Sequence, residues 1–451
     1  MSVDFGLNVG GTAQICVPIA VAIGIFFTLK LEDNMDILED LQWRGAINQE
    51  TDAEGLAKEI ADHKIALYCG TDPTGDSMHI GHLIPFMILE RFARYGHHPY
   101  ILIGGATGSI GDPSGRKSER QLQTMEQVHH NEVALTKQMK KLFGRNSDIT
   151  IVNNYDWTKD VSLLDFLRDY GKLFNVNTML AKDVVASRLD QGISFTEFTY
   201  QILQAFDFYH LYKNHHVQLE IGGSDQWGNI TAGTDLIHRL AGPDAKVFGL
   251  TIPLMVKADG TKFGKTAGGA VWLDPEKTST YEFYQFWFNQ DDRDVIKYLK
   301  YFTFLDKDQI DALAEKVKAE PWKREAQKVL AEQVTEFVHG KEAVENAERI
   351  SAILFKGNVQ KLSTAEVAQA FNGVPTSEIS NTPINIVDLI MELGVDKSKR
   401  QAREDVTNGA ITVNGVKVTD VETEINPADN FDGKYVIVRR GKKKHFLAKV
   451  K

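Results

Sequence analysis

The sequence predicts an α/β protein whose first part holds a parallel sheet with helices on both faces, followed by a helical unit and a small α+β unit. Three observations support this expectation. Short β-rich runs alternate with helical stretches from about residue 67 to 277, the pattern then becomes helical, and a basic segment with a hairpin signal closes the chain. Alternating strands and helices are typical of a parallel sheet, which binds ligands beyond the carboxyl ends of its strands.

Length and composition limit the kind of protein this can be. The 451 residues are enough for two or three domains, and 43% hydrophobic with 25% charged residues is ordinary for a globular protein. The net charge of -10 excludes a uniformly basic nucleic-acid binder but permits a local basic face. Two cysteines, Cys16 and Cys69, are too few for a disulfide scaffold or a thiolate metal site and favour a reducing compartment.

The first 34 residues differ in character from the rest. Residues 15–29 are almost wholly apolar, but this run is shorter than the roughly 20 residues that a membrane span needs. No Lys or Arg precedes it and no small-residue cleavage site follows, so a signal peptide is not indicated. We expect Met35 to begin the functional chain and residues 1–34 to be an extension outside it, with a membrane anchor as the alternative.

Four apolar runs, each of which contains glycine, are the expected strands of the sheet. They are IALYCG at 65–70, PYILIGG at 99–105, VQLEIGG at 217–223 and FGLTIPLM at 248–255.

After the sheet, apolar residues at three- and four-residue spacing predict a helical domain over 281–355. Residues 356–383 are rich in Ser, Thr, Asn and Pro, which suggests a linker. The last unit, 384–451, is expected to contain an amphipathic helix, a basic helix ended by Asn408-Gly409, and a hairpin with a type I′ turn at Asn414-Gly415. Its end is strongly basic.

The stretch YCGTDPTGDSMHIGH, at 68–82, follows the first expected strand. We expect a helix to begin near Met78, capped by Asp76 or Ser77, so that His79 and His82 share one face. The glycine between the histidines leaves room for a flat ligand, and such a helix start suits a polyphosphate. Spacing alone leaves a metal site, a phosphate site and a structural role open, although no third zinc ligand lies nearby.

The stretch KADGTKFGKTAGG places Lys262, Lys265 and Thr266 on a glycine-containing loop after the last strand. The two flexible ammonium groups and the hydroxyl can stay in contact with phosphate groups as their charge and position change during a reaction. An ordinary solvated basic loop is the alternative.

A third stretch puts Tyr200, Gln204 and Asp207 on one face of an otherwise apolar helix. A polar seam among apolar residues needs partners, which either other side chains or a small polar ligand can supply.

Two further segments carry charge at strand ends. Asp112 lies in a glycine-rich segment that leads into a basic loop with Arg116, Lys117 and Arg120, which indicates either an anion site or a solvated loop. Asp225 follows the third strand, where a carboxylate can accept hydrogen bonds from a ribose diol or cap a helix.

Together, HIGH at 79–82 and KFGKT at 262–266 resemble the double signature, HIGH and KMSKS, of the class I aminoacyl-tRNA synthetases. The stretches TEFTYQILQAFD and GGSDQWGN resemble the bacterial tyrosyl members in particular, and the likeness runs from about Met35 to the end. It implies a Rossmann-type catalytic domain over 35–280, a helical tRNA-contacting domain over 281–355, a linker over 356–383 and an S4-like RNA-binding domain over 384–451.

The resemblance also implies roles by position. Tyrosine would be bound by Tyr68, Asp112, Asn154, Tyr200, Gln204, Asp207 and Gln226. ATP would be bound by Gly70, Asp72, His79, Gly81, His82, Gly223, Asp225 and Lys265. Catalysis would use Thr74, His79, His82, Lys262, Lys265 and Thr266, with Arg116 and Arg120 closing from the other side. Phe263-Gly264 replaces Met-Ser of the generic signature, but both lysines remain.

The implied activity is that of a tyrosine–tRNA ligase. The tyrosine carboxylate attacks the α-phosphorus of ATP to give tyrosyl-adenylate and pyrophosphate, and tyrosine then passes to the 3′ end of tRNA(Tyr). ATP is a substrate accompanied by Mg²⁺, and no protein-bound metal or tightly bound prosthetic group is expected. The resemblance further implies a cytoplasmic homodimer with no membrane partner. A tryptophanyl-tRNA synthetase and a non-catalytic RNA-binding paralogue are the competing hypotheses.

Overall fold

A computed structural model describes most of the chain from Met35 onward. The described residues are 35–115, 118, 120–144, 149–186, 188–190, 192–261, 263–266, 269–441 and 444–451. Our expectations for residues 1–34, Arg116, Lys117 and Lys262 lie outside this set, as do the side chains of Lys265 and Thr266. In the part of the chain that is described, no helix is long and apolar enough to cross a membrane.

The first domain is built on a six-stranded sheet in the order β1-β6-β5-β2-β3-β4, and its strands are parallel except for the edge strand β1. The strands are β1 Gln49–Glu50, β2 Ala66–Thr71, β3 His98–Ile103, β4 Thr150–Asn153, β5 Val217–Gly223 and β6 Phe248–Ile252. The four strands expected from the sequence are therefore present, and the prediction of an α/β fold is confirmed.

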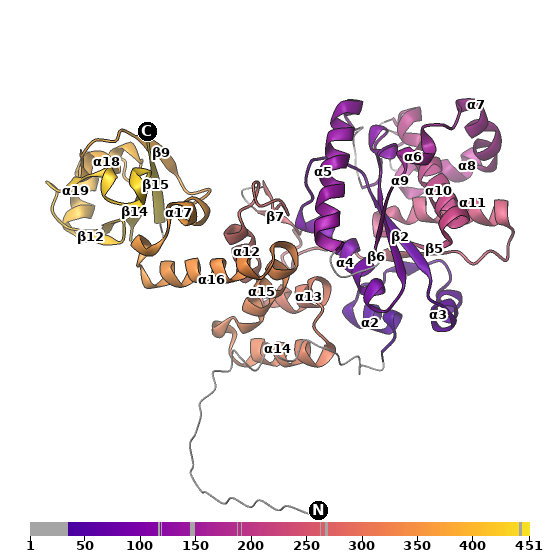
Figure 1. The fold of residues 1–451 in the computed structure, drawn as a ribbon, viewed down its shortest axis with the longest axis horizontal. Coiled ribbons are helices and arrows are strands. Elements are labelled where there is room, and N and C mark those ends of the chain that lie inside the picture. Colours follow the sequence, from indigo (N-terminus) through magenta and orange to yellow (C-terminus); the bar gives the residue numbers. More distant parts are fainter. Residues whose placement is uncertain are drawn as a thin grey trace, which may run out of the picture.

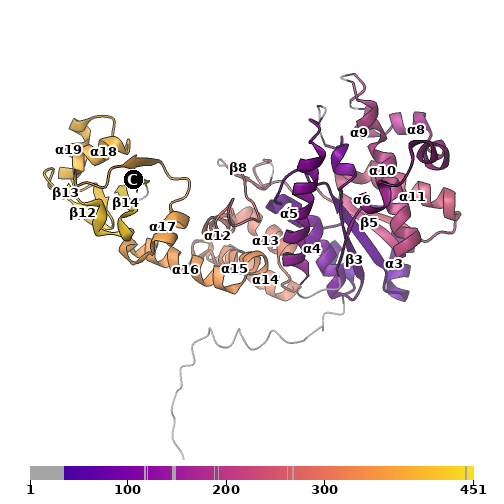
Figure 2. The same cartoon turned by 45° about the horizontal axis from the view of Figure 1, so that its top comes forward.

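Helices cover both faces of this sheet (Figure 2). The helices of this domain are α2 Ile37–Arg44, α3 Ala53–Asp62, α4 Ile80–Arg94, α5 Met125–Phe143, α6 Tyr155–Thr158, α7 Leu163–Asp165, α8 Val176–Leu180, α9 Asp183–Ala186, α10 Phe195–His215 and α11 Trp227–Ala241. One face of the sheet packs against α4 and α5, the other against α10 and α11. Side chains alternate along β2, so Leu67 joins the core under α4 while Tyr68 packs with Phe208 and Leu211 of α10.

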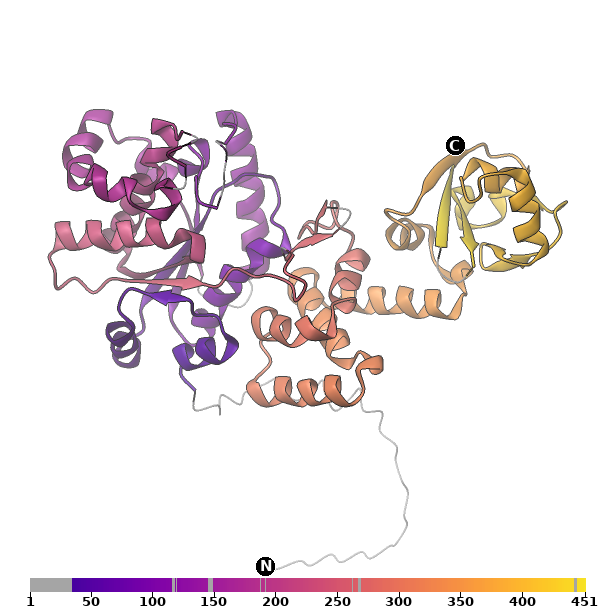
Figure 3. The same cartoon turned by 180° about the vertical axis from the view of Figure 1, so that it is seen from behind.

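The helical domain follows in the middle of the molecule (Figures 1 and 3). It comprises α12 Thr280–Phe288, α13 Asp292–Phe302, α14 Lys307–Ala319, α15 Glu325–His339 and α16 Lys341–Lys356. Trp287, Tyr298 and Phe302 are fully or almost fully buried, and they belong to one continuous core with the first domain. The two domains are thus joined by shared apolar packing as well as by the chain.

The C-terminal domain lies beyond the long helix α16, at the far end from the first domain (Figure 1). Its five-stranded sheet has the order β12-β11-β14-β15-β9. The elements are α17 Thr364–Ala370, β9 Thr376–Ile379, β10 Ile384–Asn385, α18 Ile386–Glu392, α19 Lys399–Thr407, β11 Ile411–Val413, β12 Val416–Val418, β13 Glu424–Ile425, β14 Tyr435–Arg440 and β15 Lys444–Val450. Asn414 and Gly415 both have positive φ, as the predicted type I′ turn requires.

The expectation of a linker over 356–383 was wrong for much of that stretch. Residues 364–370 form α17, and β9 pairs in parallel with β15. The polar composition that suggested a linker instead supplies a helix start, because Ser363 caps α17 and the side chain of Glu366 completes a capping box.

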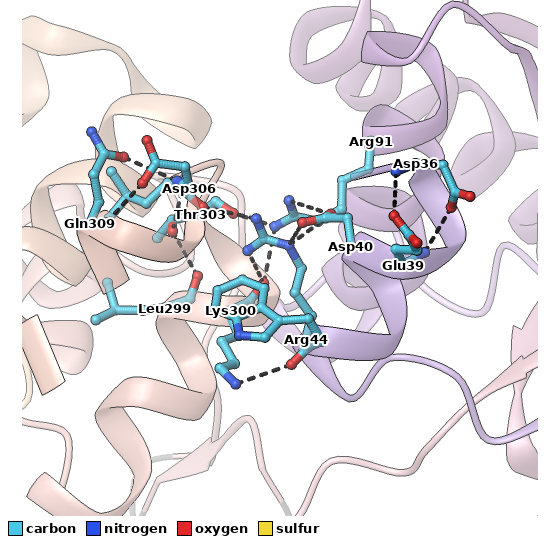
Figure 4. A network of polar contacts seen from close by, with 12 residues as sticks. Asp36, Glu39, Asp40, Arg44, Arg91, Leu299, Lys300, Thr303, Asp306 and Gln309 are labelled. Carbon is cyan, nitrogen blue, oxygen red and sulfur yellow. Dashed lines mark hydrogen bonds and ion pairs between the residues drawn. The ribbon is translucent and has the colours of Figure 1, made fainter. Parts of the chain in front are cut away.

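A buried network of charged side chains holds the first two domains together (Figure 4). Arg44 of α2 donates to the Lys300 carbonyl over 2.9 Å and to the Leu305 carbonyl over 2.8 Å. Arg91 of α4 donates to the carbonyls of Lys300 and Thr303. Asp40 accepts two hydrogen bonds from Arg44 and pairs with Arg91 at 3.7 Å. The two guanidinium groups therefore cap the carboxyl end of α13, where carbonyls lack partners within the helix.

Candidate active site

The HIGH segment forms the start of α4, but not with the cap expected from the sequence. The helix begins at Ile80, and His79 is its N-cap, with its Nδ1 accepting from the Gly81 backbone N–H at 3.0 Å. Asp76 instead pairs with Lys277, and the Ser77 hydroxyl donates to the Met78 carbonyl. The expected cap at Asp76 or Ser77 was wrong because Met78 and His79, which precede the helix, are held against a distant segment of the chain.

That distant segment follows the KFGKT loop, so the two signatures meet. Ile80 N–H donates to the Val271 carbonyl over 3.0 Å, and Leu273 N–H donates to the Met78 carbonyl over 2.8 Å. Gly264 has a φ of 86° and lies against the HIGH glycine, since a Cβ placed on it would be 3.5 Å from Gly81 N. This contact places the loop backbone beside the start of α4.

The two histidine rings are stacked on each other. Their ring centroids lie 3.8 Å apart, and the His79 N–H points to His82 Nδ1 at 3.5 Å. Burial lowers the pKa of His82 to about 3. Because Nδ1 is the acceptor in both rings, a neutral imidazole carries its proton on Nε2 and can donate it to an anion. Gly81 is needed for this arrangement, because a Cβ there would lie 2.8 Å from the His79 ring.

Among the described residues, no group of three or more His, Cys, Asp or Glu side chains could hold a metal ion.

Phe263, within the loop signature, is anchored in the helical domain. Its ring is 8% exposed and lies 4.9 Å from Tyr298, 5.2 Å from Phe302 and 5.9 Å from Trp287 between ring centroids. After it, β7 Lys265–Thr266 pairs with β8 Gly269–Ala270. The backbone of the loop is thus fixed at one end by an aromatic cluster of α12 and α13. The roles of Lys262, Lys265 and Thr266 remain predictions.

The predicted polar seam of α10 and Tyr68 belong to one cluster of buried side chains, which we call the candidate amino-acid pocket. Asp207 accepts hydrogen bonds from Asn154 Nδ2 and from Trp157 Nε1, each at 2.8 Å. Tyr68 is 1% exposed and packs against Phe208 with ring centroids 5.3 Å apart. Burial raises the pKa of Tyr68 well above its ordinary value, and the negative charges of Glu220 and Asp207 raise it further. This end of the pocket can meet a phenol.

Tyr200 connects the seam to the loop after β2. Its hydroxyl donates to Asp72 Oδ2 at 2.8 Å, and Thr107 donates to the other Asp72 oxygen at 2.7 Å. The same Thr107 hydroxyl accepts from Asn154 over 2.9 Å, which ties the two ends of the pocket together.

A chain of amides forms the other wall of the pocket. Gln204 Oε1 accepts from Asn229 Nδ2 at 3.0 Å, and Asn229 also donates to Gln226 Oε1 at 3.2 Å. Gln226 Nε2 then donates to Asp112 Oδ2 at 2.7 Å. The structure therefore brings all seven predicted tyrosine-binding residues into one connected region, although their roles in binding remain predictions.

Three buried carboxyl groups give the pocket a negative character. Burial raises the pKa of Asp207 to about 7, of Glu220 to about 7 and of Asp72 to about 6. Hydrogen bonds from neutral partners lower these pKa values only in part. Such a site favours a cationic group, because a positive charge would stabilise the ionised carboxylates.

The residues predicted for the nucleotide side lie at strand ends around the same edge. Gly70 is in the last part of β2, and Thr74 N–H donates to the Asp72 carbonyl over 2.8 Å. Gly223 ends β5, and a Cβ placed on it would lie 2.6 Å from Asp225 Oδ1. The Asp225 carboxylate also lies near Gly115, 3.2 Å from a Cβ placed there. The backbone of Gly115 and of Gly223 therefore lies directly beside the Asp225 carboxylate.

Arg120 is held at the edge of the pocket. Its Nε donates to the Asp112 carbonyl at 2.7 Å, and its backbone N–H donates to Glu197 Oε1 at 2.8 Å. Glu197 in turn forms a buried ion pair with Arg188 at 2.9 Å. The basic loop is therefore attached to the start of α10, where Arg120 can reach an anion beside Asp112.

Sequence reasoning missed several members of these networks, namely Thr107, Trp157, Glu197, Glu220 and Asn229. One of them carried a usable signal. Glu220 is a charged residue inside the apolar run VQLEIGG, and charged residues are rarely buried without a specific partner.

Comparison with known proteins gives consistent likenesses. Residues 61–356 match the family model described as "tRNA synthetases class I (W and Y)", and residues 366–448 match the "Tyrosine--tRNA ligase SYY-like C-terminal domain". The chain is 71% identical over 417 residues to a tyrosine–tRNA ligase of Limosilactobacillus reuteri, covering 92% of this chain and 100% of that one. It is 67% identical over 417 residues to the Levilactobacillus brevis protein of the same name, with the same coverage.

Among solved structures, the chain resembles a C-terminally truncated mitochondrial tyrosyl-tRNA synthetase of Aspergillus nidulans. The TM-score is 0.64 at 34% sequence identity, and the match covers 71% of this chain and 94% of that one.

Proposed function

Because the chain belongs to the tyrosine–tRNA ligases among the class I tRNA synthetases, we propose that it activates L-tyrosine with ATP and transfers it to tRNA(Tyr) through the site described above. The observation that carries this proposal is the buried, hydrogen-bonded cluster of Tyr68 with the α10 seam of Tyr200, Gln204 and Asp207, together with the contact of the two signature segments.

The phenol end of the substrate would lie between Tyr68 and Asp207. Asn154 and Trp157 hold the Asp207 carboxylate from behind, so its remaining acceptor capacity is directed into the pocket. Phenylalanine would leave these buried polar groups without a partner, at a cost of roughly 1–3 kcal/mol for each lost hydrogen bond. The tyrosyl-tRNA synthetases are themselves the standard example of an enzyme that rejects phenylalanine in this way without an editing step.

The ammonium group would lie toward Asp112, Tyr200 and Gln204. Asp72 and Asp112 supply negative charge on this side, and Gln204 presents its carbonyl oxygen to Asn229. An ammonium group has three donors and no acceptor, which suits a wall of carboxylate and amide oxygens.

ATP would bind across the start of α4. The substrate carboxylate is itself the nucleophile, so the protein has to position it and stabilise the charge that develops on the α-phosphoryl group and on pyrophosphate. His79 and His82 are suitable neutral donors, and the loop lysines would add positive charge. Mg²⁺ would come with the nucleotide phosphates.

The tRNA would contact the helical and C-terminal domains. Lys397, Lys399, Arg400 and Arg403, on and just before α19, are all exposed, and they form a local basic face on an acidic protein. Phosphate contacts through such a face make binding fall with rising salt. We place this reaction in the cytoplasm, where its three substrates occur together.

A homodimer is supported by exposed apolar side chains in the segment between β4 and α10 and at the start of α10. Leu163, Leu164, Leu167, Val176 and Phe195 are exposed, with Phe195 74% accessible. Apolar groups gathered on one segment indicate an interaction surface. We propose that a second copy of the chain covers them, which sedimentation of wild type and of Phe195→Asp would test.

The decisive experiment is ATP–pyrophosphate exchange measured with each of the twenty amino acids. Exchange with tyrosine alone is expected. Exchange with tryptophan would favour the tryptophanyl enzyme, and exchange with none would favour a non-catalytic RNA-binding paralogue.

A further inference from the structure

Glu220 is a buried carboxylate that the proposed reaction does not use. It lies in β5 and is 3% exposed. Tyr68 of β2 is its register partner, so both side chains project from the same face of the sheet toward α10 and α11. Gln204 Nε2 donates to Glu220 Oε1 at 2.9 Å, and the Tyr68 hydroxyl interacts with the same carboxylate. Glu220 therefore contacts one residue from each end of the substrate pocket.

The surroundings of Glu220 fit no simple packing role. Among the described residues, neither the second oxygen, Oε2, nor the Tyr68 hydroxyl has a well-formed hydrogen-bond partner. A Cβ placed on Gly233 of α11 would lie 3.4 Å from Oε2 and 2.7 Å from the Phe208 ring, so the carboxylate is enclosed by tightly packed neighbours. Burying a carboxylate with incomplete hydrogen bonding is costly, and an apolar residue would fill this strand position without that cost.

A carboxylate accepts hydrogen bonds and, when ionised, donates none. Facing Glu220, the Gln204 amide has to present its NH₂ group to the strand and its Oε1 to Asn229, in the direction of Gln226 and Asp112. The reverse orientation would turn an NH₂ group toward the substrate ammonium, where two donors would meet. The hydrogen bond to Glu220 thus determines which way the Gln204 amide is oriented, and through it the donor and acceptor order of Asn229 and Gln226.

We propose that Glu220 is a positioning residue that fixes the orientation of the Gln204 amide and of the Tyr68 hydroxyl, and thereby determines how tightly the site binds tyrosine. This inference rests on the proposed function. It adds a residue that touches no substrate atom but controls groups at both the ammonium and the phenol ends.

The test compares three substitutions of one residue by pyrophosphate exchange. Glu220→Leu removes both acceptors, Glu220→Asp withdraws the carboxylate from Gln204 by one methylene, and Glu220→Gln keeps the shape and one acceptor oxygen. We expect Glu220→Leu to raise the KM for tyrosine about tenfold or more and to weaken the preference over phenylalanine, with the KM for ATP changed by less than about twofold. Glu220→Asp should give a smaller rise, and Glu220→Gln should recover most of the wild-type KM.

Glu90→Leu is the matched control, because Glu90 is equally buried at 3% exposure but pairs with Arg94 outside the pocket. It should lower the melting temperature and leave the tyrosine KM unchanged. The proposal is overturned if Glu220→Leu and Glu220→Asp keep the wild-type tyrosine KM, or if they raise the ATP KM equally. If Glu220→Leu does not fold, Glu220→Asp decides alone. Absence of tyrosine-dependent exchange in the wild type would instead contradict the proposed function.

Discussion

The amino-acid pocket and the junction between the first two domains both bury charged side chains, but the charges have opposite signs. The pocket contains Asp72, Asp207 and Glu220, whose partners are neutral amides, hydroxyls and an indole. The junction contains Arg44 and Arg91, whose partners are Asp40 and main-chain carbonyls at the end of α13 (Figure 4).

The two regions differ in whether the protein itself compensates the buried charge, which is the difference expected between a domain junction and a candidate binding site. At the junction, carbonyls of α13 and the Asp40 carboxylate receive most of the guanidinium hydrogen bonds, so the network is largely complete within the protein. In the pocket, neutral donors leave the carboxylate charge unbalanced, and burial raises the pKa of each carboxyl group. Buried carboxylates whose hydrogen-bond partners are neutral can be stabilised by a positively charged ligand, so this cluster indicates a cationic ligand.

The largest effect is expected at the junction. Arg91→Met should lower the free energy of unfolding by about 3–5 kcal/mol, because it removes charged hydrogen bonds to two carbonyls and a partner of Asp40. Urea denaturation measures this. The KM for tyrosine should not change in the folded fraction. Arg94→Met is the control, since the partly exposed Arg94 pairs with Glu90 at 3.0 Å and lies over the Phe304 ring but donates to none of these carbonyls, and its loss should cost about 1 kcal/mol. Equal losses from both variants would contradict the structural role of the junction.

A smaller effect is expected in the pocket, and it should appear in activity. Asp207→Ala should lower kcat/KM for tyrosine in pyrophosphate exchange by roughly a hundredfold, which corresponds to about 3 kcal/mol. The KM for ATP should stay within about twofold, because the proposed function assigns Asp207 to the phenol of tyrosine and not to the nucleotide. Stability should fall less than in Arg91→Met, since the substitution also removes a costly buried carboxylate. An unchanged tyrosine KM and rate would remove Asp207 from the site.

The smallest effect concerns pH. The folded-state pKa values of Asp207, Glu220 and Asp72 are raised above their ordinary values of 3.8, 4.5 and 3.8, to about 7, 7 and 6. The folded state therefore binds more protons than the unfolded state between about pH 4 and 7, and these groups contribute stability that is lost as pH rises through that window. The ammonium group of tyrosine favours the ionised carboxylates, so its affinity should rise several-fold from about pH 5.5 to 7.5.

Calorimetric titration of tyrosine in two buffers with different ionisation enthalpies checks this, because binding near about pH 6.5 should release protons. Arg91 at the junction stays charged throughout, since burial lowers its pKa only to about 9. A tyrosine affinity that does not vary over this pH range would show that the pocket carboxylates are already ionised without substrate.

Local patterns in the sequence predicted most of the fold. The four strands, the α10 seam and the turn at Asn414-Gly415 all depend on neighbours within a few residues, and each is present. The cap of α4 could not be predicted in this way. Asp76 and Ser77 are ordinary caps by residue type, but pairing of Met78 and Ile80 with residues 271–273 moved the helix start to His79.

The candidate site also contains residues that local spacing predicts and residues that only the tertiary fold brings together. Tyr200, Gln204 and Asp207 share a helix face and were predicted together, whereas their partners Asn229, Trp157 and Glu220 come from elsewhere in the chain. Nothing in the spacing of Glu220 indicates that it faces Tyr68, because that neighbour is set by the register between β2 and β5. The Arg44–Arg91 junction was also missed. Its acceptors are mostly main-chain carbonyls, which every residue type has, so no sequence pattern marks them.

The position of β15 in the C-terminal sheet has a consequence for how this domain is made. It is the last strand that the structure describes, and it lies between β14 and β9 rather than at an edge. During synthesis β9 and β14 emerge before β15, and the edges that it joins stay unpaired until residues 444–450 leave the ribosome. A chain that stopped before Lys444 would keep both edges open, and exposed strand edges promote pairing with other chains. Termination before β15 should therefore yield aggregation-prone protein.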